Sequence, residues 1–491
     1  MEENLRHAAE HRSLVDLVEL RADHLLPSEA AAAASFPAKV GLPCILTVRR
    51  RTDGGVFGGT EAQRLALLRK LIGAGFAGVD VEEDLQAPDL DAAAKAAGVT
   101  VVRSFHDFDG VPADLARRIQ RLPRNPAEIA KVAVTPRTSA QLAALLEACM
   151  GARAAATAGA DSPRVILGMG EIGFPTRVLA ARLGSSWSYA SPTAQAVAPG
   201  QVTPQTLIEL YRFRSLRPST QVFGVMGNPV MHSRSPRIHN LGYATLGIDA
   251  VYLPFLVPDV AEFWNTADLL GIRGLSVTVP HKTAVIGPRV SGDEDVRLIG
   301  ACNTLYRPAA PGPWSGANTD MEGFLSPLRG ALGGRLPGGL RAVVIGAGGA
   351  ARSVVAALGS AGARVLVCNR TVANARRLAQ AFGAEYAGLD AETLAAAGAG
   401  ADIIVQTTSA GMAPQQDLDP APALRFRETT LVYELVYAPA ETPLVRRALA
   451  AGCRVVYGWQ MLLAQARRQF LLFTGQEYPR ELMGTLGPTG D

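Results

Sequence analysis

Short apolar runs alternate with amphipathic segments through the first half of the chain. Runs typical of buried parallel strands lie at 17–21, 44–49, 78–82, 100–106, 129–134, 164–169 and 186–188. Helical patterns, such as those at 61–74 and 139–150, lie between them. Regular alternation of strand and helix over this length favours a parallel (β/α)8-type barrel over an open sheet, so the sequence predicts an α/β protein.

Polar side chains recur on one face near the C-terminal ends of five of these strands. Alternate residues of a strand share a face. The pairs are Glu19 and Arg21, Thr47 and Arg49, Asp80 and Glu82, Ser104 and His106, and Lys131 and Ala133. Active sites of barrels lie at this end of the strands. Ordinary solvation of strand ends would explain any one pair, whereas the recurrence on five strands favours a site.

A strand, a glycine-rich turn and a helix follow one another in the second half. The apolar run 341–345 leads into Gly346-Ala347-Gly348-Gly349-Ala350-Ala351, and a helical pattern at 352–358 precedes another run at 364–368. In such a turn Gly346 permits the bend, Gly348 lets backbone N–H groups approach a pyrophosphate, and Ala351 allows close helix packing. This order predicts a Rossmann dinucleotide-binding domain, with a doubly wound domain that binds no nucleotide as the alternative.

The second of these strands ends in Asn369-Arg370-Thr371. Sites that prefer NAD usually place Asp or Glu here for the ribose 2′-hydroxyl, whereas an arginine suits a 2′-phosphate. We therefore expect NADP as the cofactor.

Two further segments of the second half carry candidate chemistry. Ser233 and Ser235 precede a helical pattern, where a hydroxyl either caps the helix or holds a carboxylate. A strand-like run at 274–278 turns at Pro280 and places Lys282 just beyond its end. Both segments lie on connections between elements, where binding residues are common.

The composition narrows the class of protein. At 491 residues, of which 48% are apolar, the chain should form two or three packed domains, and no apolar run approaches the ~20 residues that span a bilayer. No export signal is visible. Five cysteines without paired spacing and seven histidines without metal-binding spacing predict reduced thiols, a cytoplasmic location and no metal. A net charge of +4, without basic residues interleaved with aromatic ones, argues against nucleic acid.

Lysine is scarce in this arginine-rich chain. Only five of the 48 basic residues are lysines: Lys39, Lys70, Lys95, Lys131 and Lys282. Because a guanidinium stays protonated, it forms no imine and moves protons poorly. Lys131 and Lys282 lie in the segments described above and are therefore the candidate catalytic amines.

The polar segments of the first half form a family pattern. They are Glu19-Leu20-Arg21-Ala22-Asp23, Thr47-Val48-Arg49, Ser104-Phe105-His106-Asp107-Phe108, Lys131-Val132-Ala133-Val134, Met169 with Arg177, and Pro199-Gly200-Gln201. Over about residues 13–203 the chain resembles type I 3-dehydroquinate dehydratase. The resemblance implies that Lys131 forms a Schiff base with the ketone of 3-dehydroquinate. His106 would remove the C2 proton and then help the C1 hydroxyl to leave as water.

The same resemblance implies a substrate pocket. Its residues would be Arg21, Arg49 and Arg177, which grip the carboxylate and hydroxyls, with Glu19 and Gln201 completing it.

The chain departs from this family's pattern at three places. The family usually has a glutamate where Asp53 stands and a serine where Val197 stands. Its first strand normally precedes the first helix, whereas residues 2–13 here read as helix. We therefore expect either a barrel of seven strands that lacks its first strand, or a further strand encoded upstream of Met1.

The second half carries another family pattern. Its segments are 233–236, 274–282, 300–304, 316–323, 346–351, 369–371, 407–412 and 461–466. Over residues 222–475 they resemble shikimate dehydrogenase. The resemblance implies that Lys282 and Asp320 form the catalytic dyad, with Lys282 as proton donor, while the hydride of NADPH reduces the 3-ketone of 3-dehydroshikimate. Read without the resemblance, Lys282 could be a surface lysine and Asp320 a helix N-cap.

This second resemblance also implies binding residues. The substrate residues would be Ser233 and Ser235 for the carboxylate, Thr278, Asn303, Asp320 and Gln465 for the ring hydroxyls, and Tyr437 near the carboxylate. The cofactor residues would be Gly346, Ala347, Gly348, Gly349, Ala350, Asn369, Arg370, Thr371, Thr407 and Gly458. The family often has a second arginine where Asn374 stands, and Arg376 or Arg377 could replace it.

These assignments predict a barrel at 1–212, a linker at 213–221, a shikimate-binding domain at 222–325 and 455–491, and an NADP domain at 326–454. The predicted function is dehydration of 3-dehydroquinate followed by NADPH-dependent reduction to shikimate, by a monomer or homodimer acting on small molecules. Three alternatives remain: a dehydrogenase with a catalytically weak structural barrel, a preference for quinate or NAD, and an NADP-responsive regulator.

Overall fold

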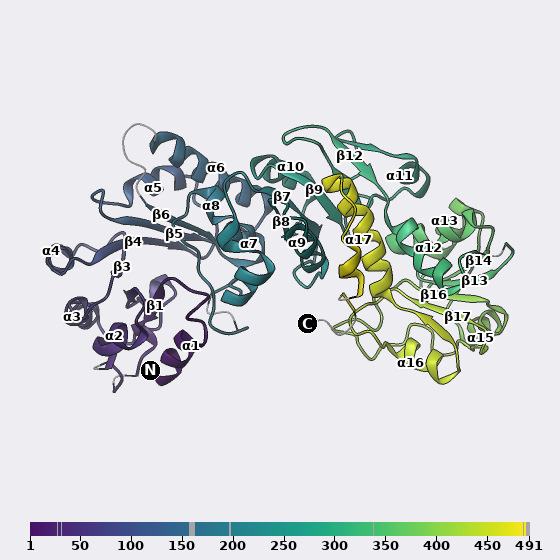
Figure 1. The fold of residues 1–491 in the computed structure, drawn as a ribbon, viewed down its shortest axis with the longest axis horizontal. Helices are drawn as coiled ribbons and strands as arrows, with labels where there is room; N and C mark the ends of the chain where they lie inside the picture. Colours follow the sequence, from purple (N-terminus) through teal and green to yellow (C-terminus); the bar gives the residue numbers. More distant parts are fainter. Residues whose placement is uncertain are drawn as a thin grey trace. The chain divides into compact units, whose positions relative to one another are not determined.

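The computed structural model describes residues 1–26, 28–30, 32–156, 163–195, 198–336, 338–484 and 486–487, and it forms two compact units (Figure 1). The first unit contains residues 1–221 and 249–271. The second contains residues 222–248 and 272–491. Each unit is built around parallel or mixed sheets, as the alternating sequence pattern predicts.

The first unit is organised around one sheet of six parallel strands in sequential order. The strands are β1 (Val18–Arg21), β2 (Cys44–Thr47), β3 (Gly78–Glu82), β4 (Thr100–Asp107), β5 (Ile129–Val134) and β6 (Arg164–Gly168). Every residue of β2 and β3 is buried, including the polar Thr47, Asp80 and Glu82. Parallel strands in sequential order joined by helices form the wall of a half-barrel.

Helices connect and cover these strands (Figure 1). They are α1 (Glu2–Glu10), α2 (Phe36–Val40), α3 (Glu61–Ile72), α4 (Pro88–Ala96), α5 (Leu115–Arg121), α6 (Ser139–Ala156), α7 (Gly170–Val178) and α8 (Ala180–Leu183). The segment 249–271 adds β8 (Ala250–Leu256) and α10 (Val260–Leu269), and α10 packs against α6. Short turns of helix lie at Ala22–His24, Ala32–Ser35, Arg51–Asp53, Thr206–Leu210 and Phe213–Ser215. The helical patterns predicted at 61–74 and 139–150 are confirmed as α3 and α6.

The strand predicted at 186–188 is wrong. Residues 186–188 have no strand pairing, although Ser186 N donates to Arg164 O at 2.7 Å, next to the start of β6. One ladder-like bond does not make a strand, and the sheet within the described residues therefore has six strands rather than seven. Residues 2–13 do begin with a helix, α1, as expected.

The second unit contains part of a mixed sheet that follows the linker. Within this unit the strand order is β10 (Val290–Gly292), β12 (Trp314–Ala317), β11 (Thr304–Tyr306), β9 (Ile272–Val277) and β7 (Gln221–Gly227). Strand β11 is antiparallel to both of its neighbours, whereas β7 and β9 are parallel. The helices of this part are α9 (Ser235–Thr245), α11 (Glu294–Ile299) and α12 (Asp320–Ala331).

The other sheet of the second unit is fully parallel. Its order is β15 (Glu385–Ala387), β14 (Arg364–Cys368), β13 (Arg341–Ile345), β16 (Ile403–Gln406), β17 (Leu431–Glu434) and β18 (Arg454–Val456). Its helices are α13 (Gly349–Ser360), α14 (Val372–Phe382), α15 (Ala391–Gly400) and α16 (Pro443–Ala450). Numbered within this sheet, the order is 3-2-1-4-5-6, which is the Rossmann topology. The two strands predicted at 341–345 and 364–368 are confirmed at both ends.

The long helix α17 (Gly458–Thr474), yellow in Figure 1, follows the last strand of the parallel sheet and packs against α12, α9, β9 and β11. A short turn of helix at Arg480–Gly484 comes after it. These contacts agree with the expectation that the C-terminal residues rejoin the substrate-binding part. The boundaries 1–212, 213–221, 222–325 with 455–491, and 326–454 stay a prediction.

Within the described residues, no helix is both long enough and apolar enough to cross a membrane.

Candidate active sites

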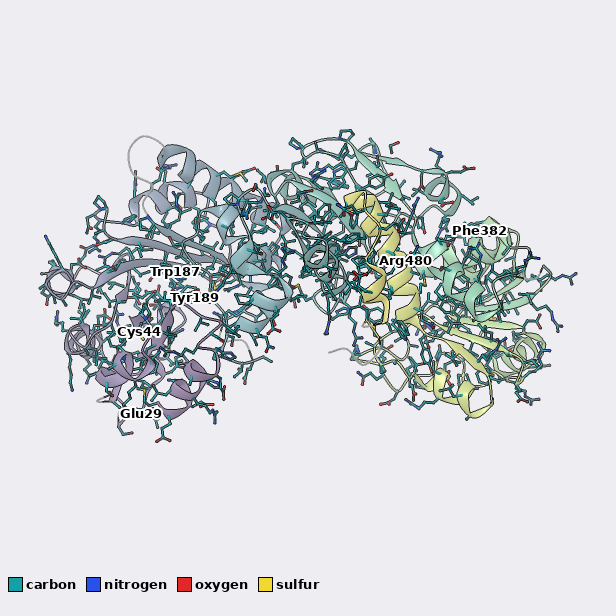
Figure 2. The ribbon with its side chains drawn as sticks, viewed as in Figure 1. Glu29, Cys44, Trp187, Tyr189, Phe382 and Arg480 are labelled. Atoms are coloured by element: carbon teal, nitrogen blue, oxygen red, sulfur yellow. The ribbon has the colours of Figure 1, made fainter. Side chains whose placement is uncertain are left out.

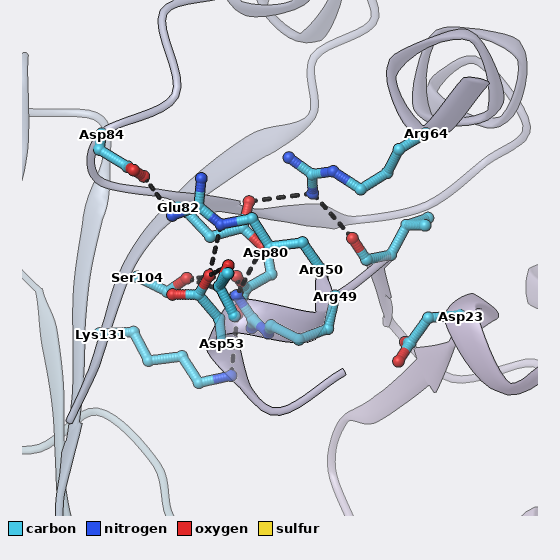
Figure 3. Close-up of polar contacts among 12 residues, drawn as sticks. Asp23, Arg49, Arg50, Asp53, Arg64, Asp80, Glu82, Asp84, Ser104 and Lys131 are labelled. Carbon is cyan, nitrogen blue, oxygen red and sulfur yellow. Dashed lines mark hydrogen bonds and ion pairs between the residues drawn. The ribbon is translucent and has the colours of Figure 1, made fainter. Parts of the chain in front are cut away.

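The half-barrel buries a lysine among acidic side chains. Lys131, on β5, is only 5% exposed. Its Nζ donates to Asp80 Oδ2 at 2.8 Å and lies 3.5 Å from Glu19 Oε2 (Figure 3). Burial lowers the pKa of the Lys131 amine, but the carboxylates of Asp80 and Glu19 more than reverse this and raise it above its ordinary value. The resting amine is therefore an ammonium held by two carboxylates.

Asp80, on β3, is surrounded by donors. Besides Lys131, its Oδ1 lies 2.8 Å from an Arg49 guanidinium nitrogen and accepts from Ser104 Oγ at 2.6 Å. Burial raises the pKa of Asp80, but Arg49 and Lys131 hold it well below its usual range. Asp80 is thus a permanent anion.

The charge network continues away from the lysine. Arg49 also donates to Ser104 Oγ at 2.8 Å and to Glu82 Oε1 at 3.2 Å. The other oxygen of Glu82 accepts from Arg64 at 2.9 Å (Figure 3). Alternating charges along Lys131, Asp80, Arg49, Glu82 and Arg64 leave each buried charge paired, which is what makes their burial tolerable.

His106, on β4, lies in the same electrostatic environment. Burial lowers its pKa, and the positive charges of Arg49 and Lys131 lower it further, so the imidazole is neutral near pH 7. Its Nδ1 is buried and has no hydrogen-bond partner among the residues that the structure describes. A neutral imidazole beside an ammonium is in the protonation state that a general base needs.

The aspartate that replaces the usual glutamate is bound by its neighbours in sequence. The Asp53 carboxylate is held by the Arg50 guanidinium and accepts from Thr52 Oγ1 at 2.9 Å. The other departure, Val197, lies outside the described residues.

Two further arginines of the predicted dehydratase site, Arg21 and Arg177, differ in how their guanidinium groups are bound. Arg21 lies close enough to His106 to lower its pKa, and it donates to both oxygens of Asp23 at 2.9 and 2.7 Å. Arg177, on α7, donates to Pro199 O at 3.0 Å, while its Nε and second NH group are buried with no partner in the described part of the chain. Burial lowers the pKa of Arg177 to about 10. A buried cation with two free donors is suited to an anionic ligand.

The Gln201 side chain bonds within its own loop, where its oxygen accepts from Ala198 N at 3.0 Å.

Two aromatic residues of this site were missed by the sequence reading. The Lys131 Nζ lies 4.5 Å from the ring centre of Tyr189, a cation–π distance. Trp187 packs against the same apolar cluster as Tyr189, and both are labelled in Figure 2. The false strand at 186–188 concealed them, although an aromatic pair at alternate positions after the last strand was a usable signal. Asp80 was seen as a strand-end carboxylate but was not assigned to Lys131.

The second unit contains the predicted lysine–carboxylate pair. The ammonium of Lys282 forms an ion pair with Asp320 Oδ2, and Asn303 Nδ2 donates to Asp320 Oδ1 at 2.8 Å. Lys282 is mostly buried, which excludes the surface-lysine reading. Asp320 is the first residue of α12 and Thr319 is its N-cap, so the N-cap reading of Asp320 is also excluded.

Asn303 joins several predicted residues. Its Nδ2 also lies 3.3 Å from Gln465 Oε1, and its Oδ1 accepts from Thr319 N at 2.7 Å. Gln465 lies on α17, and Gly323 allows α12 to approach it, since a Cβ at Gly323 would lie 2.7 Å from Gln465 Cβ. Helix α17 therefore places Gln465 next to Asn303, which contacts Asp320.

The predicted carboxylate-binding residues lie at the start of α9. Ser233 Oγ accepts from Ser235 N at 3.3 Å, and Arg234 is the N-cap of the helix, so neither serine caps it by side chain. Burial raises the pKa of Tyr437, and Arg234 lies close enough to oppose this rise. Thr278 packs against Gly227, at the end of β7. Ser233, Ser235 and Tyr437 therefore share one region.

The glycine-rich turn has the backbone that the sequence predicts. Gly346 has φ +113°, and a Cβ there would lie 2.4 Å from Thr407 Oγ1, so only glycine fits. Thr407 fixes the opposite side by donating to Ile345 O at 2.7 Å. A Cβ at Gly348 would meet nothing within 4 Å, and one at Gly349 would lie 3.6 Å from Lys282 Cδ. The turn thus leaves open space above the N-terminus of α13 and lies against Lys282.

The other predicted cofactor residues line the ends of the same strands. Ala347 and Ala350 belong to the turn, and Asn369, Arg370 and Thr371 follow β14. Arg370 is exposed, and Asn369 Nδ2 donates to Thr371 O at 3.0 Å. The Arg377 guanidinium contacts Asn374 Oδ1. Gly458 begins α17, where a Cβ would lie 2.4 Å from Leu435 O.

Further polar residues of this unit were not predicted. Gln469 Oε1 accepts from Ser276 Oγ at 2.6 Å, and Gln469 Nε2 donates to Thr304 Oγ1 at 3.0 Å. Their signal was weak, because a glutamine and a serine 193 residues apart give no local pattern. No group of metal-binding side chains occurs among the described residues.

These features define an α/β protein with two candidate sites: an ion-paired lysine in a parallel half-barrel, and a lysine–aspartate pair beside a dinucleotide-binding turn. Three family models match the chain. The model for type I 3-dehydroquinase matches residues 1–218, that for the shikimate dehydrogenase substrate binding domain matches 225–305, and that for shikimate / quinate 5-dehydrogenase matches 337–419.

A relative spans almost the whole chain. The chloroplastic bifunctional 3-dehydroquinate dehydratase/shikimate dehydrogenase of Arabidopsis thaliana is 31% identical over 492 residues, which cover 96% of this chain and 80% of the relative. The chain therefore belongs to the family of bifunctional 3-dehydroquinate dehydratase/shikimate dehydrogenases.

Other similarities cover the second half. The shikimate dehydrogenase (NADP(+)) of Moorella thermoacetica is 42% identical over 279 residues, covering 55% of this chain and 92% of the relative. The crystal structure of shikimate dehydrogenase from Aquifex aeolicus has a TM-score of 0.50 and 32% identity, covering 55% of this chain and 98% of that chain. A shikimate dehydrogenase solved in complex with NADP+ has a TM-score of 0.50 and 34% identity, covering 55% and 96%.

Proposed function

We propose that this protein catalyses two consecutive reactions, the dehydration of 3-dehydroquinate to 3-dehydroshikimate and the NADPH-dependent reduction of that product to shikimate. The observation that supports the first reaction is the buried amine of Lys131 near the neutral imidazole of His106. The observation that carries the second is the ion pair of Lys282 and Asp320 beside the Gly346 turn.

In the dehydration, Lys131 forms an iminium with the substrate ketone and releases one water. The iminium withdraws electrons and acidifies the adjacent C2–H bond, and His106 takes that proton. The same imidazole then returns a proton to the C1 hydroxyl, which leaves as water. Hydrolysis of the product iminium consumes one water, breaks the C=N bond and frees Lys131, so the net loss is one water. The free donors of Arg177 would bind the substrate carboxylate, with Arg21, Arg49, Glu19 and Gln201 around the ring.

In the reduction, Lys282 donates a proton to the oxygen of the substrate ketone, and Asp320 holds that ammonium in place. Ser233, Ser235 and Tyr437 would hold the carboxylate. Thr278, Asn303 and Gln465 would bind the ring hydroxyls. NADPH, when bound, supplies the hydride.

The residues present fit NADP. The left-handed backbone at Gly346 and the open space at Gly348 leave room for a pyrophosphate at the N-terminus of α13, where backbone N–H groups point outward. The exposed guanidinium of Arg370 at the end of β14 suits a 2′-phosphate. Relatives that match the second half are named as NADP(+) enzymes.

A direct test uses the scarcity of lysine. Borohydride reduction in the presence of 3-dehydroquinate should fix an adduct on Lys131, and peptide mass spectrometry can assign it among the five lysines. Initial rates with shikimate or quinate, and with NADP+ or NAD+, test the second half. Absence of the adduct would contradict the proposed dehydratase activity. Equal rates with NADP+ and NAD+ would contradict the proposed role of Arg370 in binding the 2′-phosphate.

Two observations favour a second candidate for the first unit. His106 Nδ1 lacks a partner, and the sheet has six strands within the described residues. An imidazole with no orienting partner is held less firmly. If the half-barrel is catalytically weak, the adduct fails to form while shikimate dehydrogenase activity remains.

We also propose that the protein works in a reducing, cytoplasmic compartment as a monomer or homodimer, on small molecules and without nucleic acid. All five cysteines are free and buried, which supports the reducing compartment. Light scattering of the purified chain tests the oligomeric state.

A further inference from the structure

The charge network around Lys131 contains one carboxylate with an unusual set of partners. Asp80 accepts from the Lys131 amine nitrogen through Oδ2, while its Oδ1 contacts both Arg49 and Ser104. Its side chain is completely buried. A carboxylate with all of these donors is fixed in position and cannot rotate away from the amine.

We propose that Asp80 is the permanent counter-ion of the Lys131 nitrogen, which it positions both as the ammonium of the resting protein and as the iminium of the covalent intermediate. This inference rests on the proposed dehydratase function and adds a positioning residue to it. The two family resemblances and the alternation of side chains along the strands assign Asp80 no role toward Lys131.

The stoichiometry of imine formation supports this role. An ammonium and a ketone give an iminium and one water: the C=O bond breaks, a C=N bond forms, and two of the three ammonium protons leave with the ketone oxygen as water. The net charge on nitrogen is +1 before and after. A carboxylate at 2.8 Å therefore stabilises both states, and it opposes only the neutral amine between them.

The other groups that face Lys131 are less suited to this role than Asp80. Glu19, on β1, lies at 3.5 Å rather than 2.8 Å. Arg49 and His106 are a cation and a neutral base, and Tyr189 presents the face of its ring. Because Asp80 is held anionic by Arg49, it does not serve as the proton acceptor for the amine. That leaves His106 and Glu19 for the proton transfers.

Glu82 provides a matched control. It is buried in the same network and contacts Arg49 and Arg64, but it does not contact Lys131. Asp80→Asn and Glu82→Gln each remove one buried carboxylate charge at nearly constant volume. A general loss of network charge would affect both variants equally, whereas a counter-ion role is specific to Asp80.

The first experiment measures the protonation of the Lys131 amine in the absence of substrate. Trace acetylation with acetic anhydride over a range of pH, followed by peptide mass spectrometry, gives a titration midpoint for each of the five lysines. In the wild type we expect the midpoint of Lys131 to lie above those of the exposed Lys39, Lys70 and Lys95. In Asp80→Asn it should fall by roughly one pH unit or more, and in Glu82→Gln by much less.

The second experiment reads the covalent step. Borohydride trapping in Asp80→Asn should still give the Lys131 adduct, with its optimum at lower pH, while dehydration turnover falls roughly 100-fold. Glu82→Gln should lose much less turnover. Shikimate oxidation by the same preparations controls for the amount of folded second unit.

The outcomes separate the two claims. Equal Lys131 midpoints in the wild type and Asp80→Asn, or equal shifts in both variants, would overturn the counter-ion role. If Asp80→Asn does not fold, the titration midpoint of Lys131 in the wild type tests the counter-ion role. A midpoint equal to or below those of the exposed lysines would overturn that role. A wild type that gives no adduct but a raised midpoint would overturn the dehydratase function and leave the ion pair standing.

Discussion

Lys282 and Asp320 form an ion pair through one oxygen of the carboxylate, while the other oxygen accepts from Asn303 Nδ2 at 2.8 Å. Asn303 in turn has its own oxygen occupied by Thr319 N and Thr304 Oγ1, at 2.7 and 2.8 Å. Because the amide of Asn303 is fixed at both ends, the carboxylate of Asp320 can face Lys282 with only one oxygen. The dyad is therefore held by the sheet that carries Asn303 and by the N-terminus of α12.

This arrangement predicts the effect of removing either partner. Lys282→Ala should lower kcat for shikimate oxidation by about 10²–10⁴-fold, since it removes the general acid–base group. Asp320→Asn should lower kcat less and leave NADP+ binding intact. Lys95→Ala, at an exposed lysine, is the matched control and should keep wild-type rates. Unchanged turnover in Lys282→Ala would exclude the dyad, and a wild type without turnover would favour the regulator.

The two glycines of the dinucleotide turn should respond differently to the same change. Gly346→Ala places a Cβ at φ +113° and 2.4 Å from Thr407 Oγ1, so we expect a loss of about 1–3 kcal/mol in stability. Gly348→Ala meets nothing within 4 Å in the protein and should leave the Tm unchanged. NADP+ affinity should nevertheless fall in Gly348→Ala, because the added methyl group occupies the space assigned to the pyrophosphate.

Differential scanning fluorimetry and NADP+ titration by fluorescence measure both quantities. Wild-type NADP+ affinity in Gly348→Ala would show that the cofactor does not approach the turn.

Selectivity for NADP+ over NAD+ should depend on Arg370. Arg370→Ala should weaken NADP+ binding roughly 10- to 100-fold and leave NAD+ binding nearly unchanged, since only NADP+ has the 2′-phosphate. Arg377, which contacts Asn374, should contribute in the same direction. Arg364→Ala is the control, because Arg364 is exposed and lies at the opposite end of β14 from Arg370. Equal losses for both cofactors in Arg370→Ala would contradict this assignment.

The parts of the fold that could be predicted have local patterns. Strands β13 and β14 are buried apolar runs bounded by glycine or polar residues, and both ends of each were predicted correctly. The turn between β13 and α13 has a steric signature, because Gly346 adopts a backbone that other residues avoid. Such features depend on neighbours in sequence and so can be read from it.

The parts that could not be predicted depend on distant residues. Asp80 and Lys131 are 51 residues apart, and parity could place both at strand ends without showing that they pair. Gln469 reaches Asn303 O across 166 residues. The segment 186–188 has strand-like composition but makes only one ladder-like bond to β6, and composition cannot report the missing partner.

Glu434 should make stability depend on pH. It is completely buried at the end of β17, where it accepts from Val436 N at 2.9 Å and Thr442 Oγ1 at 2.7 Å. Burial raises its pKa to about 7, against an ordinary value of 4.5. The folded protein therefore binds a proton between these two values that the unfolded chain has released, and the free energy of unfolding falls as pH rises from about 4.5 to 7.

The size of this effect follows from the shift, which corresponds to about 3 kcal/mol at alkaline pH as an upper value. Glu434→Gln removes the titration. The difference in Tm between variant and wild type should therefore move in favour of the variant from pH 5 to pH 8. The exposed Glu428→Gln is the control and should track the wild type at every pH. Thermal unfolding at the two pH values measures this, and a constant Tm difference for Glu434→Gln would show that the buried carboxyl group does not titrate in this range.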